Sequence, residues 1–159
     1  MAIPSSIEYF GTITVTAAQL AKMNEAQLAM YYRVKGGSNS TLTSALNALS
    51  LTTGVIGLFL PGGAATVAGL VSATSGVAGS IPSYTSNLAY VMQEGCNAMT
   101  KMSGQIANAT KYDLFEIQFT FIEFRSKNIR YIQGPSQNKD NPAKIIRAHV
   151  KGGGWVSWN

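Results

Sequence analysis

The sequence predicts an α+β fold, in which an uncharged helical hairpin and its flanking helices pack with a small antiparallel C-terminal sheet. Three observations lead to this prediction. Apolar residues recur at helical spacing over residues 17–111, and they alternate with polar residues over residues 113–158. Between Lys35 and Glu94 there are 58 consecutive positions without a charged residue. Because the chain has 159 residues, we expect a single domain, residues 1–159, with one sizeable core.

The first predicted elements are a short strand and a helix. Residues 7–15 (IEYFGTITV) are rich in β-branched and aromatic side chains, which favours a strand. Thr16 can then cap a helix, with Gln19 three positions later as its capping-box partner. We expect this helix over residues 17–35, because a pair of glycines follows at 36–37.

The uncharged segment predicts two helical arms over residues 42–81. The first arm runs to Leu60, and the second starts near Ala64. Between them, Pro-Gly-Gly at 61–63 ends one helix and permits a tight reversal. Neither arm has the composition of an ordinary transmembrane span, because hydroxyl and amide side chains interrupt both.

Small residues recur at intervals of four in the second arm, as in Ala65, Gly69 and Ala73. This glycine-zipper spacing lets helix backbones approach closely. A glycine costs a water-exposed helix up to about 1 kcal/mol relative to alanine, so we expect close packing or lipid to compensate. The residues expected to insert into a membrane or to pack helix against helix are Gly54, Gly57, Leu58, Phe59, Leu60, Pro61, Gly62, Gly63, Ala65, Gly69, Ala73, Gly76 and Gly79.

A further helix is predicted over residues 83–111, where Met92, Met99 and Met102 lie on one apolar face. A methionine stripe at helical spacing indicates a core face rather than a metal or cofactor site. The single cysteine, Cys96, lies in the same pattern, and we expect it to be a buried, inert thiol.

Alternation with a period of two predicts strands in the last third of the chain. It is clear at 115–122, weaker at 127–133 and present again at 143–151. A polar loop at 134–142 separates the last two strands. We expect an antiparallel sheet, which the strand at 7–15 could also join.

Basic residues concentrate near the C-terminus. The chain has 12 basic and 7 acidic residues, a net charge of +5, and the residues from Arg125 onward alone carry +6. Such a surplus attracts anionic partners, and tryptophan prefers the headgroup level of a membrane. We therefore expect binding to an anionic lipid surface rather than to nucleic acid. The residues expected to bind this surface are Arg125, Lys127, Arg130, Tyr131, Lys144, Arg147, Lys151, Trp155 and Trp158.

The side chains that catalysis would need are sparse. His149 is the only histidine, and Glu116 and Glu123 are seven positions apart on a predicted strand, which places them on opposite faces. The sequence has no phosphate-binding glycine loop, nucleophile motif or cluster of metal ligands. We therefore expect no enzyme activity, no cofactor, no metal and no small-molecule substrate.

These patterns favour a membrane-active protein, a pore-forming or bacteriocin-like toxin whose hairpin inserts into lipid. The arrangement resembles in kind the buried hydrophobic hairpin of pore-forming colicins. The resemblance covers about a quarter of the chain, and it implies a hairpin that leaves a folded protein and enters a membrane. It implies no residue roles.

Two alternatives stay open. One is a self-assembling structural subunit of a filament, shell or crystalline inclusion, inside or outside the cell, in which the small-residue stripe lies between copies. The other is a monomeric binding module with the hairpin as its core. We expect a homo-oligomer in the toxin and subunit cases. Residues 1–6 show no basic or apolar signal region, so we expect synthesis in the cytoplasm without a signal peptide, and action at a membrane or after release.

Overall fold

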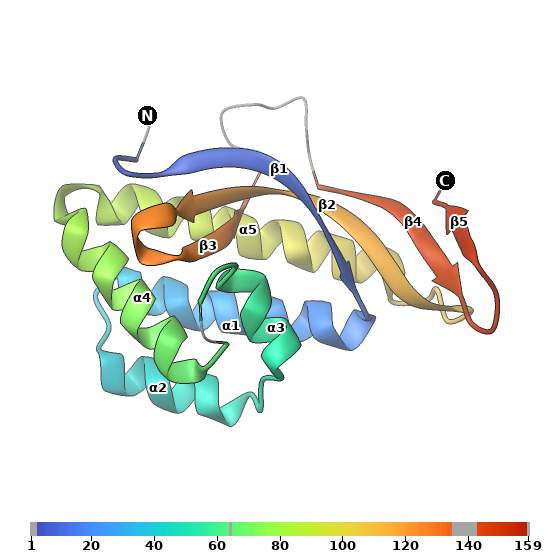
Figure 1. Cartoon of the computed structure of the whole chain (residues 1–159), viewed down its shortest axis with the longest axis horizontal. Coiled ribbons are helices and arrows are strands. Elements are labelled where there is room, and N and C mark those ends of the chain that lie inside the picture. The colour runs from blue at the N-terminus through green and yellow to red at the C-terminus, as the bar shows by residue number, and fades with distance from the viewer. Residues whose placement is uncertain (1–2, 64, 135–142, 159) are drawn as a thin grey trace.

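A computed structural model of the chain describes residues 3–63, 65–134 and 143–158. These residues form an α+β arrangement of five α-helices and one five-stranded antiparallel sheet (Figure 1), as the sequence predicts. Residues 135–142 of the predicted polar loop lie outside the described residues. In chain order, the elements are β1 (Ile7–Val15), α1 (Ala17–Val34), α2 (Asn39–Ala48), α3 (Thr53–Phe59), α4 (Val67–Ser80), the 3₁₀ turn η1 (Pro82–Tyr84), α5 (Thr85–Ile106), β2 (Tyr112–Phe124), the 3₁₀ turn η2 (Arg125–Lys127), β3 (Ile129–Gln133), β4 (Lys144–Val150) and β5 (Trp155–Ser157).

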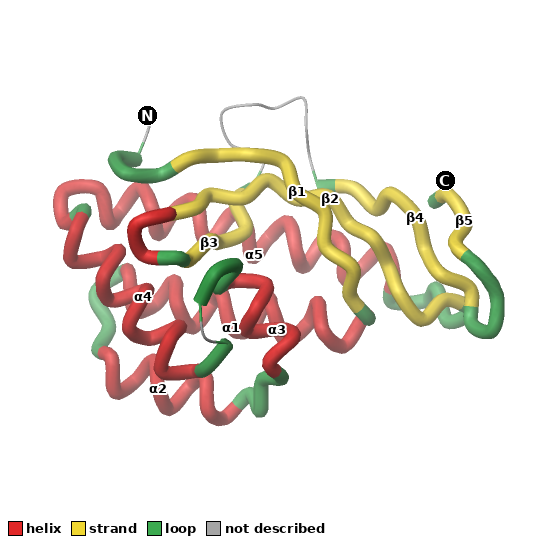
Figure 2. Tube along the Cα trace, viewed as in Figure 1, coloured by secondary structure: helices red, strands yellow, loops and turns green. Residues whose placement is uncertain are grey.

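The long strand β2 is the centre of the sheet. On one side it pairs with the whole of β1, from Ile7 opposite Glu123 to Val15 opposite Phe115. On the other side it pairs with β4 in its first half and with β3 in its second half (Figure 2). β5 pairs with β4. The N-terminal strand therefore belongs to the same sheet as the C-terminal strands.

Helix α1 starts directly after β1 because its first turn is capped. The Thr16 hydroxyl accepts a hydrogen bond from the Gln19 N–H at 3.0 Å, and Gln19 Oε1 accepts one from the Thr16 N–H at 2.9 Å. The predicted capping box is confirmed. α1 and α5 lie side by side; α1 also contacts β1 and β2, and α5 contacts β3. α2, α3 and α4 all contact α1.

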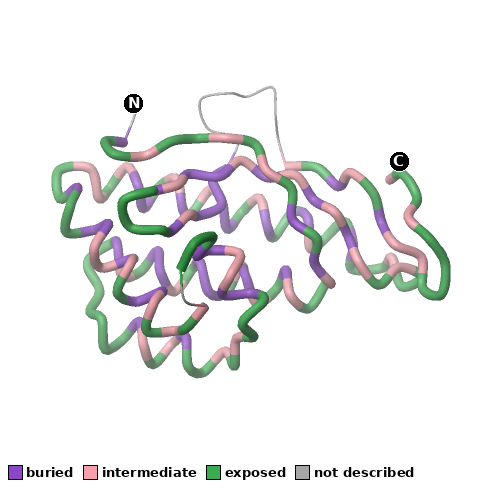
Figure 3. Tube along the Cα trace, in the orientation of Figure 1, coloured by how far each residue is buried: buried purple, intermediate pink, exposed green. Residues whose placement is uncertain are grey.

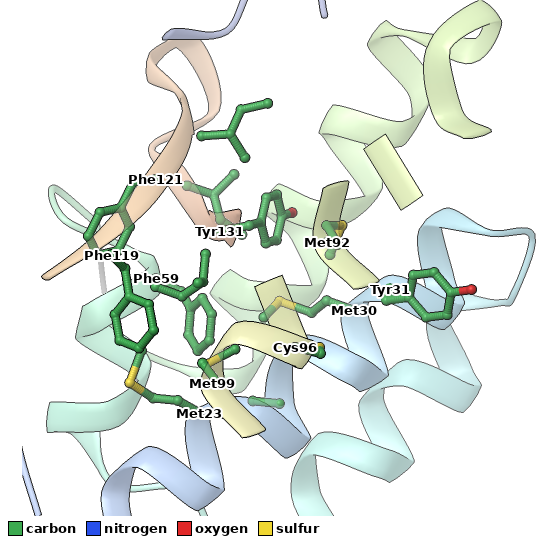
Figure 4. Close-up of a cluster of buried hydrophobic side chains, with 14 of the residues drawn as sticks. Met23, Met30, Tyr31, Phe59, Met92, Cys96, Met99, Phe119, Phe121 and Tyr131 are labelled. Carbon is green, nitrogen blue, oxygen red and sulfur yellow. The ribbon is translucent and has the colours of Figure 1, made fainter. Parts of the chain in front are cut away.

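Methionine side chains form much of the core between α1 and α5. Met23 and Met30 from α1 and Met92 and Met99 from α5 are completely buried, and Phe59 reaches the same cluster from α3 (Figure 4). The predicted methionine face is therefore a core face. Methionine suits this place because its unbranched, polarizable side chain adapts to irregular gaps in a core.

The predicted first arm of the hairpin is divided into two helices. α2 ends at Ala48, and Ser50 follows with a left-handed φ of 52°. The Thr52 hydroxyl then accepts a hydrogen bond from the Val55 N–H at 3.3 Å, which starts α3 as a separate helix. Hydroxyl side chains in this short stretch compete with the helical hydrogen bonds, which explains the break. Figure 3 shows many exposed and half-buried residues along α2 and α4.

Candidate functional site

The α3–α4 hairpin consists of α3, α4 and the turn between them, and it carries the residues predicted to insert. Phe59 and Leu60 are buried, and Leu58 and Ala65 are half-buried. The tip of the turn, residues 61–63, is exposed. In this fold the bulky apolar side chains of the hairpin therefore face inward, and its glycine-containing tip faces outward.

Three helical glycines of the hairpin have open space beside them. A methyl group added at Gly57 or Gly79 would meet no atom of the surrounding structure within 4 Å, and one added at Gly54 would meet the Thr52 hydroxyl at 3.9 Å. Of the two expected compensations, close packing or lipid, close packing is therefore not found at these three glycines in the described part of the fold, and compensation by lipid stays a prediction. The spacing of small residues in the sequence does not show which atoms of the fold lie next to each of them.

The small-residue stripe of α4 lines a hollow on the surface. Gly69, Ala73 and Gly76 line it from α4, and Lys127 and Asn128 line it from the turn after β2. The volume of the hollow is about 360 Å³. The Lys127 Cδ would lie 3.3 Å from a methyl group added at Gly76. A lysine stem rather than a second helix therefore covers this position of the stripe.

A second hollow, of about 540 Å³, lies between α2 and α4. From α2 it is lined by Asn39, Thr43 and Asn47, which follow one another at intervals of four. At one end the Arg33 Nε donates to Asn39 Oδ1 at 2.6 Å, and the Arg33 Nη2 donates to the Ser75 hydroxyl at 3.2 Å. This polar groove was not predicted from the sequence, although the regular spacing of amide and hydroxyl side chains at Asn39, Thr43 and Asn47 was a signal for it.

Polar contacts also hold the hairpin to the sheet. The hydroxyl oxygens of Thr74 and Tyr131 lie 2.9 Å apart, and the Arg130 Nε donates to the Leu58 carbonyl at 2.8 Å. Figure 4 shows the Tyr131 ring among the labelled side chains of the core cluster. Burial raises the pKa of the Tyr131 hydroxyl above its ordinary value, so this group stays protonated at neutral pH.

Two of the nine residues predicted to bind a surface have structural contacts instead, the buried Tyr131 and the half-buried Arg130. Tyr131 is fully buried, and the Arg130 guanidinium lies 4.1 Å from the centre of the Phe121 ring. The Arg130 Nη1 also donates to the Tyr9 hydroxyl at 3.0 Å, and this hydroxyl donates to Glu123 at 2.6 Å. Burial, followed by the bond to Glu123, raises the pKa of Tyr9. The surface assignment of Arg130 and Tyr131 is wrong because α3, α4 and α5 all contact β3.

Trp158 is a third residue with a structural role. Its ring centre lies 5.7 Å from that of Tyr112 and 5.9 Å from that of Phe115. The side chain is half-buried and packs against the main core. Its assignment to a binding surface is therefore corrected: Trp158 fixes the C-terminal end of the chain to β2.

The exposed basic residues of β4 and the turn after it are Lys144, Arg147 and Lys151. The Arg147 guanidinium stacks on the half-buried Trp155, 4.4 Å from the ring centre. Its Nη2 also lies 3.3 Å from a Glu116 carboxylate oxygen. The positive charge of this group is therefore partly compensated.

Arg125 and Lys127 form a separate basic group at the other end of β2. They lie in η2, which follows the last residue of that strand, whereas β4 pairs with its first half (Figure 1). Arg125 is 3.5 Å from Glu123 and its side chain is largely exposed. The structure thus divides the predicted basic surface into two exposed basic groups and three residues with structural contacts, Arg130, Tyr131 and Trp158.

Reactive side chains are few among the described residues. Desolvation raises the pKa of Cys96 to about 12, so its thiol is protonated and inert at neutral pH, as the sequence predicts. His149 Nδ1 lies 2.7 Å from Asp113 Oδ1. Within residues 3–63, 65–134 and 143–158, no group of three or more His, Cys, Asp or Glu side chains could hold a metal ion. In the same ranges, every helix is too short or too polar to cross a membrane.

Comparison of the chain with family models, with curated proteins and with solved structures gives no match.

Proposed function

We propose that this protein is a membrane-active, pore-forming or bacteriocin-like toxin whose α3–α4 hairpin leaves the fold and inserts into lipid. The observation that carries the proposal is the open space beside Gly57 and Gly79. A glycine inside a helix costs roughly 0.5–1 kcal/mol relative to alanine. Among the described residues, no atom packs close enough to offset that cost at these two positions, whereas helices in a membrane pack closely through such small residues.

The charge pattern supports the same proposal. The hairpin lies within the 58 positions between Lys35 and Glu94 that carry no charged residue. Moving it from water to lipid therefore transfers no charged side chain, which would be the largest single cost of insertion. Its exposed tip at 61–63 can meet the membrane first.

Insertion requires that the second arm become longer. α4 has 14 residues, which is about 21 Å of helix, and the hydrocarbon core of a bilayer is about 30 Å thick. The sequence from Gly62 to Ile81 has 20 residues, enough for that span if the helix extends back toward Pro61. The proposal thus includes a conformational change in the turn.

The two exposed basic groups supply the attraction to an anionic surface. A lysine or arginine close to anionic lipid contributes about 1 kcal/mol, and the contribution decreases with ionic strength. No carboxylate of the described residues forms an ion pair with Lys144 or Lys151, whereas Arg147 shares its charge with Glu116. Lys144 and Lys151 are therefore the principal cations of this group.

Release of a dye from anionic vesicles tests the proposal. The variants are Gly57→Leu in the hairpin and Gly104→Leu in α5, both at positions where an added methyl group meets open space. We expect both variants to fold, since a Cβ at either position meets no neighbour within 4 Å, and only Gly57→Leu to lose most of the leakage. No leakage by the unmodified protein would overturn the proposal, as would equal leakage by the two variants.

A structural subunit of a filament, shell or crystalline inclusion is the second candidate. The observation that favours it is the surface hollow at Gly69, Ala73 and Gly76, which the small residues of another copy could fill. Light scattering during chromatography separates the two functions. A large assembly in buffer that ignores anionic liposomes supports the subunit, and a small species that moves to the liposome fraction supports the toxin.

A further inference from the structure

An outer strand of a β-sheet exposes a row of unpaired N–H and C=O groups, and proteins usually block such a strand. This sheet has three outer strands, β1, β3 and β5, in the described part of the chain. β3 and β5 are each blocked by a feature of the structure, whereas β1 is not blocked.

The outer side of β3 is closed by Gln27 of α1. The Gln27 Nε2 donates to the Ile132 carbonyl at 2.7 Å, and the Ile132 N–H donates to Gln27 Oε1 at 2.7 Å. The same Nε2 donates to the Met92 carbonyl at 2.9 Å, and Gln27 is fully buried. A methyl group at Gly95 would lie 1.9 Å from the Ile132 oxygen, so α5 rests directly on this strand.

The outer side of β5 is protected by its length. β5 has three residues, Trp155–Ser157, and it follows a turn at Gly152, whose φ is 71°. A strand this short offers too few backbone groups for stable pairing. It also lies beside Arg147, whose guanidinium covers the Trp155 ring.

The outer side of β1 has none of these features. Its nine residues pair with β2 in one uninterrupted register, whereas the pairing of β2 with β4 is shifted at two places. β1 contains no proline and no lysine, and its one charged residue, Glu8, accepts a hydrogen bond from the Gln133 Nε2. Ile7 and Phe10 are exposed large apolar side chains. In the described residues, β1 pairs with β2 alone.

We propose that β1 of a second copy pairs with this strand, antiparallel and about a two-fold axis at Gly11, to join the two sheets. Gly11 is the midpoint of β1, so this register uses all nine residues. It places Phe10 opposite Thr12 of the second copy, and Glu8 opposite Thr14 of the second copy. No like charges meet directly, and aromatic side chains opposite threonine are favourable cross-strand pairs. A two-fold axis also makes the contact self-complementary and closed.

Two double variants test both the contact and its register. Phe10 and Thr12 are exposed, so charged side chains at both positions are compatible with the fold. F10K/T12K places like charges opposite each other across the axis, whereas F10K/T12E places opposite charges there. Both variants carry the same lysine at position 10, which makes each the control for the other. Circular dichroism and thermal unfolding show whether each variant is folded.

Sedimentation velocity from low to high micromolar protein gives the oligomeric state. We expect a dimer for the unmodified chain, a dissociation constant raised by more than about tenfold in F10K/T12K, and recovery of the dimer in F10K/T12E. An unmodified chain that stays monomeric throughout overturns the proposal. Equal dimerisation of the two variants also overturns it, because a contact elsewhere would then hold the copies together.

Discussion

The hydroxyl groups of Thr74 and Tyr131 form a hydrogen bond of 2.9 Å between two completely buried side chains, 57 positions apart in sequence. This bond connects α4 to β3, and therefore joins the hairpin to the sheet. One hydroxyl donates and the other accepts, so each has a hydrogen-bond partner inside the core. The hairpin is thus fastened by a contact that must break before the hairpin can leave.

Removing one of these hydroxyl groups should lower the free energy of unfolding. Removing both should lower it by less than the sum of the two single effects. Thr74→Val leaves the Tyr131 hydroxyl buried without its partner, which costs about 1–3 kcal/mol. Tyr131→Phe should cost less, because the Thr74 hydroxyl can turn to the carbonyl four residues earlier in α4. Urea unfolding of the two single variants and the double variant measures the coupling. Additive effects would show that the two hydroxyls do not depend on each other.

Two glycine substitutions should have opposite effects on stability. Gly57→Ala adds a methyl group in open space within α3 and should raise the free energy of unfolding by about 0.5–1 kcal/mol. Gly95→Ala would place its methyl group 1.9 Å from the Ile132 carbonyl oxygen, which forces α5 away from β3. We expect this variant to unfold several degrees lower or to fail to fold. A Gly57→Ala protein less stable than the unmodified chain would contradict the open space described at that position.

Arg130 and Arg125 should differ in their contribution to stability. Arg130→Met removes the hydrogen bonds to the Leu58 carbonyl and the Tyr9 hydroxyl, and we expect a loss of about 1.5–3 kcal/mol. Arg125→Met changes a largely exposed side chain and should have little effect. Thermal unfolding of both variants at equal ionic strength gives the comparison. Equal melting temperatures would place Arg130 on the surface after all.

The Cys96 thiol should make the protein less stable in alkali. In the unfolded chain it ionises near its ordinary pKa of 9.0, whereas the folded chain holds its proton up to about pH 12. The stability linked to this group is therefore fully present below pH 9 and is lost as the pH rises toward 12. The Cys96→Ala variant lacks this pH dependence. Above pH 9 the free energy of unfolding of the unmodified chain should therefore decrease relative to that of the variant. Urea unfolding over a pH series tests this, and parallel profiles would argue against it.

Local signals in the sequence predicted much of the fold. The bounds of β1 and α1 follow from β-branched residues and from the Thr16 capping box, which act within a few residues. The alternation of β2 also depends on neighbouring positions alone. The break at Ser50 was missed because a left-handed serine has no local signature of its own.

The candidate site was harder to predict because it depends on distant contacts. In β3 the residues Arg130 and Tyr131 follow a weak alternation that does not show how many helices cover the strand. The contacts of β3 with α3, α4 and α5 bury Tyr131 and leave Arg130 half-buried. In the same way, the spacing of small residues in α4 does not show that Lys127 lies across from Gly76.

The position of the hairpin tip on a membrane is the measurement to make first. Gly62→Cys places a thiol at the exposed tip, in a Cys96→Ala background, and Asn97→Cys in the same background places one on the exposed side of α5. An environment-sensitive dye on each thiol reports contact with lipid when anionic vesicles are added. We predict a blue-shifted emission and quenching by lipid-borne quenchers for the dye at position 62, with little change at position 97. An unchanged signal at position 62 on vesicles that bind the protein would show that the hairpin stays in the fold.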